Sequence, residues 1–445
     1  MSNNGSTPGT LDEWLDRLSE QHPVVIDLGL DRLTIVAERL GLLAERLAPR
    51  VVTVAGTNGK GSTVAMIDAC ARAHGLSSVT YTSPHLLRYN ERVRINGVEA
   101  SDQQFMEAFD IIEKARLLEP AVSLSYFEVG TLAAALLIRH AAPDIAIMEV
   151  GLGGRLDAVN LFDADVAVVT TIGLDHADYL GTDLSVIGRE KAGIMRAGGR
   201  AVLGSRQLPS SVRTHAEALG VQSTAELGVE FDYCVDDAPR ASRNWSWQGI
   251  SGSSEPLKLD TLVQPGLPLD NAASALQALS FLDIDLVADK VSQAFADISL
   301  PGRLQRIGRW ILDVAHNPHA AHYIATQLES DMLASTRQFP VERIAVLGML
   351  GDKDAEGVVA ELNGVIQGWY CAGVEGPRAR SGEDLAKLVE AQGGKVIGVS
   401  ESVSQALDDV QEMPEWADTD ILVCGSFLTV TAALEWLEAR EISPS

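Results

Sequence analysis

The residues best suited to chemistry stand in a glycine-rich stretch, V-V-T-V-A-G-T-N-G-K-G-S-T, at residues 51–63. An apolar run leads into a loop with three glycines and Lys60, and a helical pattern opens at Ser62. Glycines let backbone N–H groups turn toward an anion, and a helix N-terminus adds partial positive charge. Lys60 would supply the charge that bridges outer phosphates. The stretch therefore predicts a phosphate-binding loop.

The standard form of such a loop, G-x-x-x-x-G-K-[ST], is not met. Its first glycine would fall at Val54, and Gly61 stands between Lys60 and Ser62. The prediction rests instead on the order strand, loop and helix. The alternative is an ordinary glycine-rich turn that carries a lysine on the surface.

Three further polar residues stand at the ends of different apolar runs: Ser83, Glu149 and His176. In open parallel sheets, ligands bind outside the carboxyl ends of the strands, so these side chains would face the phosphate loop. A hydroxyl, a carboxylate and an imidazole can share a hard cation with waters and phosphate oxygens. The alternatives are that Glu149 pairs with a structural arginine such as Arg155 and that His176 is a loop histidine.

Two other segments carry charged residues whose role the pattern leaves open. Residues 187–195 form a helical segment with Lys191, which taken alone would be a solvated helix face. Asp313 and His316 end a later strand-like run, but capping of a helix by Asn317 explains their position almost as well.

The elements that must position these residues follow an α/β pattern, because short β-branched runs alternate with longer helical patterns. The runs expected as strands are 51–55, 78–82, 144–150, 165–172, 310–315, 343–347, 368–374, 395–399 and 420–424. The patterns expected as helices are 31–47, 62–74, 102–118, 127–140, 271–282, 288–298 and 428–440. Residues 223–258 are polar, and we expect short antiparallel strands and loops there. Pro301-Gly302 separates two α/β series, which predicts domains at residues 1–299 and 310–445 joined by a hinge at 300–309.

Composition excludes several classes of protein. The 445 residues include 35 Lys+Arg and 61 Asp+Glu, and the net charge of −26 argues against binding to nucleic acid or to an anionic membrane. No apolar stretch reaches the roughly 20 residues that span a bilayer, and the first residues do not resemble a signal peptide. Four scattered cysteines are typical of buried free thiols in a reducing compartment. We therefore expect a cytoplasmic protein.

These segments together resemble the folylpolyglutamate synthases, specifically the bacterial bifunctional dihydrofolate synthase/folylpolyglutamate synthases, which are ATP-dependent amide-forming ligases related to the Mur ligases. The resemblance runs from about residue 26 to residue 437. It is carried by D-L-G-L at 27–30, A-G-T-N-G-K-G-S at 55–62, S-P-H-L-x-R-Y-x-E-R at 83–92, Y-F-E at 126–128, E-V-G-L-G-G-R-L-D-A at 149–158, L-D-H at 174–176, G-R-E-K-A-G-I at 188–194, P-G-R at 301–303 and D-V-A-H-N-P-H at 313–319. Residues 223–258 are the least similar.

The resemblance implies a fold, two cofactors and a set of site residues. The fold is α/β: a Mur ligase-like phosphate-loop domain with a parallel-rich central sheet, followed by a smaller Rossmann-like domain. The positions that match ATP-binding residues are Gly56, Thr57, Asn58, Gly59, Lys60, Gly61, Ser62, Asn271, Arg303 and Asp313. Ser83, Glu149 and His176 match ligands of Mg²⁺. Lys191 matches the lysine that the family carbamylates, and Lys60, Lys191 and His316 are the implied catalytic residues.

The resemblance also implies the substrates. The positions that match dihydropteroate-binding residues are Asp27, Leu28, Gly29, Leu30, Ser125, Tyr126, Phe127, Glu128, Leu156, Asp157 and Ala158. The implied reaction adds L-glutamate to 7,8-dihydropteroate and to reduced folates through an acyl phosphate, and we expect a monomer with no nucleic-acid or membrane partner.

Three alternatives remain: a monofunctional folylpolyglutamate synthase, a Mur-type ligase that acts on another carboxylate, and a non-catalytic nucleotide-binding protein. Proteins of the first two kinds should be less similar to the bifunctional enzymes at residues 27–30 and 125–128. The third would usually have lost Lys60, Glu149, His176 or Lys191, and all four are present.

Overall fold

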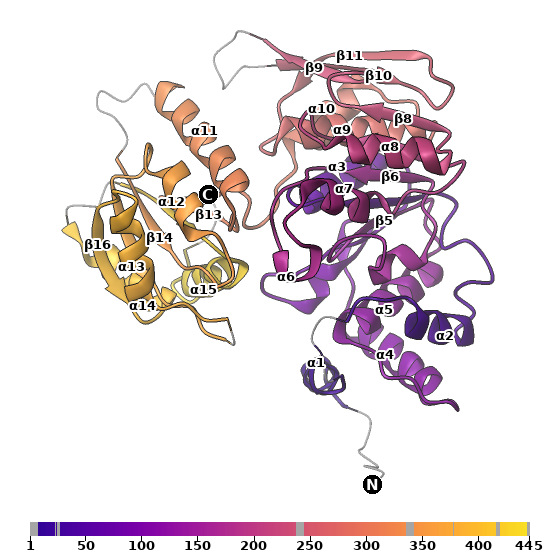
Figure 1. Cartoon of the computed structure of the whole chain (residues 1–445), viewed down its shortest axis with the longest axis horizontal. Coiled ribbons are helices and arrows are strands. Elements are labelled where there is room, and N and C mark those ends of the chain that lie inside the picture. The colour runs from indigo at the N-terminus through magenta and orange to yellow at the C-terminus, as the bar shows by residue number, and fades with distance from the viewer. Residues whose placement is uncertain are drawn as a thin grey trace. The chain divides into compact units, whose positions relative to one another are not determined.

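The computed structural model describes residues 8–22, 24, 27–236, 244–334, 342–376, 378–414 and 419–442. The described residues divide into two compact units, one that ends at Ile298 and one that begins at Ser299 (Figure 1). Each unit has its own sheet and its own apolar core.

The first unit is built on an eight-stranded sheet whose inner strands are parallel. Across the sheet the strands are β4 (Val98–Glu99), β3 (Val93–Ile95), β2 (Ser78–Tyr81), β5 (Ile145–Glu149), β1 (Val51–Ala55), β6 (Val166–Val169), β7 (Arg200–Leu203) and β8 (Ser223–Glu226). Strands β3 and β4 form an antiparallel hairpin at one edge. Because β5 and β6 flank β1, the loops that leave these three strands are neighbours.

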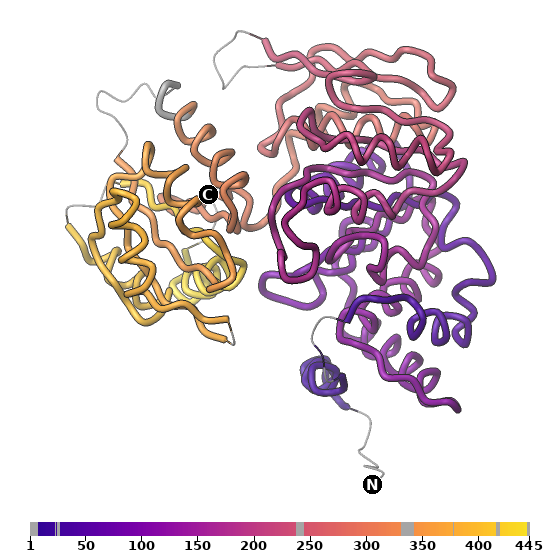
Figure 2. The backbone as a smooth tube through the Cα atoms, viewed as in Figure 1, coloured from indigo at the N-terminus to yellow at the C-terminus, as the bar shows by residue number. Residues whose placement is uncertain are grey.

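Helices cover both faces of this sheet (Figure 1). They are α1 (Leu11–Glu20), α2 (Asp31–Arg39), α3 (Lys60–Ala73), α4 (Asp102–Arg116), α5 (Tyr126–Ala141), α6 (Ala177–Leu180), α7 (Leu184–Ala192), α8 (Ser210–Leu219), α9 (Leu269–Phe281) and α10 (Ala288–Ala296), with 3-10 turns η1 (Tyr89–Arg92) and η2 (Ala158–Leu161). Helix α3 packs against β1, β2 and β5 and also against α9 and α10. Helix α5 packs against β2, helices α1 and α4 pack against α5, and α2 packs against α4 (Figure 2).

The expected helix at residues 31–47 was too long, because α2 ends at Arg39. Gly41 follows with a φ of +67°, a left-handed conformation that glycine adopts without strain and that ends helices. Arg39 then donates to the backbone carbonyls of Ala115, Leu118 and Pro120 at 2.9, 3.0 and 2.8 Å. The apolar spacing beyond residue 39 therefore belongs to a turn that packs on the core.

The expectation of antiparallel strands at residues 223–258 is only partly confirmed. Strands β9 (Asp232–Val235), β10 (Asn244–Ile250) and β11 (Pro256–Val263) form a separate antiparallel sheet, with Trp245 and Trp247 of β10 buried. Strand β8 instead pairs parallel to β7 in the main sheet. Its four residues, S-T-A-E, were too short and too polar for the sequence pattern to place it.

The second unit is a six-stranded sheet with helices. Across it the strands are β12 (Gln305–Ile307), β13 (Trp310–Asp313), β17 (Asp420–Cys424), β14 (Arg343–Leu347), β15 (Gly368–Ala372) and β16 (Val396–Ser400), and only β12 is antiparallel to its neighbour. The helices are α11 (Pro318–Ala334), α12 (Ala355–Leu362), α13 (Gly382–Ala391), α14 (Val403–Glu412) and α15 (Phe427–Glu438). The five predicted strands of this unit are confirmed to within two residues. None of the helices in the described part of the chain is long and apolar enough to cross a bilayer.

Candidate functional site

The predicted phosphate loop lies between β1 and α3 and is tied to the end of β6. The backbone N–H of Thr57 donates to the carbonyl of Thr171 at 2.8 Å, and the hydroxyl of Thr170 donates to the carbonyl of Asn58 at 2.6 Å. Gly59 precedes the helix with a φ of +84°. These contacts fix the loop, so its N–H groups at the start of α3 are held in place before any anion arrives.

Lys60 folds back over this loop instead of extending from the surface. Its Nζ donates to the carbonyls of Gly56 at 3.1 Å and of Thr57 at 3.4 Å. Lys191 of α7 reaches the same carbonyl, because its Nζ donates to Gly56 at 3.0 Å. One carbonyl at the end of β1 therefore holds two lysine side chains, which is the arrangement of a site that accepts negative charge.

The interpretation of residues 187–195 as a solvated helix face is wrong for Lys191, which is only 5% exposed, whereas Arg189 is exposed. Burial lowers the pKa of Lys191 to about 7, and the neighbouring charge of Lys60 acts in the same direction, while nearby carboxylates oppose it. Near neutral pH a substantial fraction of this amine is therefore unprotonated and nucleophilic.

The loop that follows β5 packs on α7 and holds Lys191 next to the phosphate loop. A Cβ at Gly154 would lie 2.8 Å from the carbonyl oxygen of Glu190 and 2.9 Å from that of Lys191, so only glycine allows this approach. Arg155 donates its N–H to the carbonyl of Glu190 at 2.9 Å, and its Nε forms an ion pair with the Glu190 carboxylate at 3.0 Å. The ion pair of Arg155 is thus with Glu190, not with Glu149 as the structural alternative proposed.

Two of the three predicted metal ligands lie together next to the phosphate loop. The backbone N–H of Ser83 donates to Glu149 Oε2 at 3.3 Å. The same carboxylate oxygen lies 3.5 Å from the position that a Cβ on Gly61 would take. Glu149 is buried at the end of β5, where a hard cation beside the phosphates would meet it.

His176 lies in the segment between β6 and α6, directly before α6. Its backbone has a left-handed conformation with a φ of +51°. Its Nε2 lies 3.8 Å from Asp175 Oδ2. Among the described residues, no three His, Cys, Asp or Glu side chains form a ready-made metal site. The grouping of Ser83, Glu149 and His176 as ligands therefore stays a prediction.

Asn271, which residue patterns alone did not single out, lies against the phosphate loop. A Cβ on Gly59 would be 2.6 and 2.8 Å from the two polar atoms of the Asn271 amide. The side chain is buried at the start of α9. Its position agrees with the nucleotide-contacting role that the resemblance implies.

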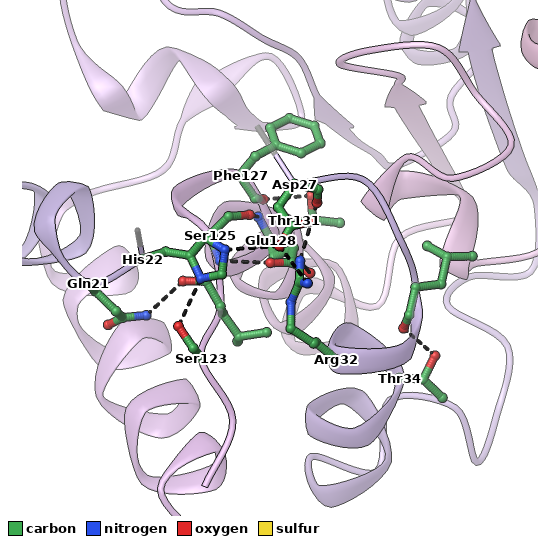
Figure 3. A network of polar contacts seen from close by, with 12 residues as sticks. Gln21, His22, Asp27, Arg32, Thr34, Ser123, Ser125, Phe127, Glu128 and Thr131 are labelled. Atoms are coloured by element: carbon green, nitrogen blue, oxygen red, sulfur yellow. Dashed lines mark hydrogen bonds and ion pairs between the residues drawn. The ribbon is translucent and has the colours of Figure 1, made fainter. Parts of the chain in front are cut away.

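Two of the segments predicted to bind the pterin, residues 27–30 and 125–128, are joined by one polar network (Figure 3). Arg32 forms an ion pair with Asp27 at 2.6 Å and donates to Glu128 at 3.2 Å. His22 Nε2 lies 3.1 Å from the same Asp27 carboxylate, and its Nδ1 lies 2.8 Å from the hydroxyl of Ser123. Arg32 and His22 were missed by the sequence analysis, although Arg32 follows D-L-G-L by only two residues.

A capping box fixes the start of α5, where Ser125 and Glu128 exchange hydrogen bonds of 2.7 and 3.3 Å. The N–H of Gly29 donates to the carbonyl of Leu156 at 3.2 Å, which joins the first segment to the third. Asp157 is buried and accepts from the backbone N–H groups of Leu152 and Val159, and burial raises its pKa to about 6. All three predicted substrate segments therefore meet at one place.

The candidate residues of the second unit lie close to one another. Asp313 accepts from the N–H groups of Leu304 and Ala315 at 2.8 Å each, and burial raises its pKa. Arg303 lies over the ring of Phe427 at 5.3 Å, and His316 Nδ1 lies 2.8 Å from the carbonyl of Val314. The capping alternative is also confirmed, since Asn317 accepts from the N–H of Ala320 at 3.0 Å. The nucleotide roles of Arg303 and Asp313 stay predictions.

Comparison with known families identifies the class of protein. The family model of the Mur ligase middle domain matches residues 54–206, and that of the Mur ligase glutamate ligase domain matches residues 302–427. The two matches cover the phosphate loop and α7 in the first unit and Asp313 and His316 in the second. The chain is a Mur-type ligase.

Comparison with individual proteins identifies the family within the Mur-type ligases. The dihydrofolate synthase/folylpolyglutamate synthase of Escherichia coli is 43% identical over 433 residues, which cover 97% of this chain and 96% of that protein. The counterpart from Mycobacterium tuberculosis is 32% identical, with coverage of 92% and 90%. The chain belongs to the dihydrofolate synthase/folylpolyglutamate synthase family and is an ATP-dependent acid–amino-acid ligase that adds glutamate.

Solved structures agree over nearly the whole chain. E. coli FolC in complex with DHPP and ADP superimposes with a TM-score of 0.87 at 41% identity and covers 98% of this chain and all of that one. A bifunctional folylpolyglutamate synthase/dihydrofolate synthase with Mn, AMPPNP and L-glutamate bound gives a TM-score of 0.84 at 41% identity, with coverage of 97% and 100%.

The close approach at Gly154 gives a first prediction. The substitution Gly154→Ala should lower the free energy of unfolding by about 1–3 kcal/mol, because the added Cβ meets fixed backbone atoms of α7. It should also reduce glutamate ligation, since α7 carries Lys191. Urea unfolding and a ligation assay measure the two effects. Gly266→Ala is the matched control, because a Cβ there meets nothing within 4 Å; equal losses in the two variants would contradict the prediction.

Proposed function

We propose that this chain is a bifunctional enzyme that adds L-glutamate both to 7,8-dihydropteroate and to reduced folates. The observation that carries the proposal is the network in which Arg32 joins Asp27 to Glu128 (Figure 3). Together with the bond from Gly29 to Leu156, it assembles the three segments where bifunctional enzymes are expected to hold the pterin. The similarity to E. coli FolC solved with DHPP and ADP, at 41% identity, supports the same conclusion.

ATP and Mg²⁺ are the proposed cofactors. The loop at residues 56–62 and Lys60 would hold the phosphates, with Asn271, Arg303 and Asp313 as further contacts to the nucleotide. Ser83, Glu149 and His176 offer oxygen and nitrogen donors that suit a hard divalent ion, and relatives have been solved with AMPPNP and Mn. A bound divalent ion neutralises charge on the phosphates. Use of ATP and the buried free thiols of Cys70, Cys371 and Cys424 support action in the cytoplasm. The expectation of burial is wrong for the fourth cysteine, Cys234, which is exposed.

The proposed mechanism activates a carboxylate, which is a poor electrophile, before the amide forms. The acceptor carboxylate attacks the γ-phosphate of ATP and gives an acyl phosphate and ADP. The amine of glutamate then attacks the acyl carbon, phosphate leaves with the C–O bonding pair, and the amine loses a proton. Lys60 would offset the charge on the transferring phosphoryl group. His316 is the proposed group that receives the proton.

Lys191 has the properties that carbamylation requires. An unprotonated amine attacks CO₂, a C–N bond forms, and one proton is released, which leaves a carboxylate on the lysine. The buried position and the pKa of about 7 make the unprotonated amine available. The product would be an additional oxygen ligand beside the phosphate loop.

Carbamylation can be observed directly. Wild-type protein equilibrated with ¹³C-bicarbonate should show a carbamate carbonyl signal by ¹³C NMR, and Lys191→Arg should lack it, because the arginine stays protonated. A signal that persists in Lys191→Arg, or no signal in the wild type, would remove Lys191 from the proposed metal site.

The function itself is tested by incorporation of labelled L-glutamate with ATP and Mg²⁺, measured separately with dihydropteroate and with tetrahydrofolate. We expect incorporation with both acceptors and none in Lys60→Ala, which loses the charge at the phosphate loop. Circular dichroism of Lys60→Ala should match the wild type. Incorporation with tetrahydrofolate alone would make the chain a monofunctional synthase, and incorporation with neither would point to a ligase for another carboxylate.

The pterin assignment predicts that Asp27→Ala affects one acceptor more than the other. It removes the carboxylate that Arg32 and His22 hold in place, so the KM for dihydropteroate should rise about tenfold, a loss of about 1.4 kcal/mol. The KM for tetrahydrofolate should change less. Steady-state kinetics with the two acceptors gives the comparison, and equal increases would contradict the assignment of residues 27–30.

A further inference from the structure

A buried arginine, Arg92, lies directly before strand β3 of the main sheet. Arg92 ends the turn η1 and is 7% exposed. Its Nε donates to Nδ1 of His85 at 2.9 Å. Its guanidinium carbon lies 5.0 Å from the ring centre of Tyr89 and 5.5 Å from that of Tyr126.

The charge of Arg92 is not balanced by a carboxylate. Within the described ranges, Arg92 forms no ion pair. Its neighbours are Tyr89, Tyr126, His85 and Tyr81, and the hydroxyl of Tyr81 accepts a hydrogen bond from it. Burial raises the pKa of Tyr81 to about 12 and that of Tyr89 well above its ordinary value, so both phenols are neutral at neutral pH. A buried cation whose described partners are aromatic faces, the phenol of Tyr81 and one imidazole is costly for folding.

The contact with Arg92 also determines the tautomer of His85. A guanidinium has donors and no acceptor, so Nδ1 of His85 must accept the hydrogen bond. The ring proton is then on Nε2, and His85 presents a fixed N–H donor on its other side. The ring of Tyr89, 5.6 Å away and nearly edge-on, limits how the imidazole can turn.

Arg92 connects two parts of the site. His85 stands two residues after Ser83, and the carbonyl of Arg92 accepts from the N–H of Thr82 at 2.8 Å. On its other side, Tyr126 begins α5, in the segment proposed to bind the pterin. The same side chain therefore contacts both the segment that carries a proposed metal ligand and the segment proposed to bind the pterin.

We propose that Arg92 is a positioning residue that fixes His85 as an N–H donor and braces Tyr126, so that the carboxylate of the acceptor substrate meets a fixed donor and a positive potential beside the phosphate loop. This role rests on the proposed function. It explains why a positive charge is kept in a buried place, since the acceptor carboxylate must approach the negatively charged phosphates of ATP.

The first test is kinetic. In Arg92→Met, kcat/KM for both acceptors should fall at least about tenfold, while the KM for ATP should stay within about twofold. Arg92→Lys keeps the charge, but its single ammonium replaces a planar fork of donors, so it should recover little of the loss. Arg39→Met is the matched control. Arg39 donates to backbone carbonyls at and after the end of α4, so its loss should lower thermal stability and leave the kinetic constants unchanged.

The second test does not depend on activity. In protein labelled with ¹⁵N-histidine, the His85 signals, identified by their loss in His85→Gln, should report an Nε2–H tautomer. Arg92→Met should shift them toward a mixture of tautomers, and Arg39→Met should not. Unchanged His85 signals in Arg92→Met, full kinetic recovery in Arg92→Lys, or equal losses for acceptor and ATP would overturn the proposal.

Different results would refute the proposed function and the role of Arg92. A wild-type protein that incorporates no glutamate with either acceptor refutes the proposed function. A wild-type protein that is active with both, combined with unaltered kcat/KM in Arg92→Met, refutes only the role of Arg92.

Discussion

The arrangement of the site depends on the carbonyl of Gly56, which accepts hydrogen bonds from both Lys60 and Lys191. Two ammonium groups that share one acceptor in a buried place repel each other, and the interaction is stronger there than in water. The pKa of Lys191 falls to about 7 as a result of burial and of this repulsion. Negative charge at the loop, whether of a phosphate or of a carbamate on Lys191, relieves the conflict. The ligand-free protein is therefore prepared for an anion.

Close backbone approaches then bring the remaining groups to this carbonyl. Gly154 allows the loop after β5 to lie on α7, which carries Lys191. Gly59 makes room for the amide of Asn271. Because β5, β1 and β6 are neighbours in the sheet, their carboxyl ends place Glu149, the phosphate loop and the segment before His176 at one edge. The strand order thus determines which chemistry can occur there.

The sequence predicted the parallel strands and the glycine-rich loop between β1 and α3 well, because buried β-branched runs and a glycine-rich turn leave clear local patterns. It could not predict that Lys191 is buried, since that depends on a loop more than thirty residues away in the chain. It also missed Arg32 and Arg92, because no local pattern shows that Arg32 reaches Glu128 or that Arg92 reaches Tyr126, each more than thirty residues away. The short, polar strand β8 was missed as well. The helix expected at 31–47 failed because apolar spacing continues past Gly41 although the backbone turns there.

Binding of a non-hydrolysable ATP analogue in the presence of Mg²⁺, measured by calorimetry, tests most directly whether this loop is the phosphate site. The account predicts that AMPPNP binds the wild-type protein and raises its unfolding temperature, with about 2.7 kcal/mol of added stability at a hundredfold excess over Kd. Lys60→Met should weaken binding at least about tenfold, whereas Gly266→Ala should bind as the wild type does. Equal affinity in the wild type and Lys60→Met would contradict the assignment of phosphate recognition to this loop.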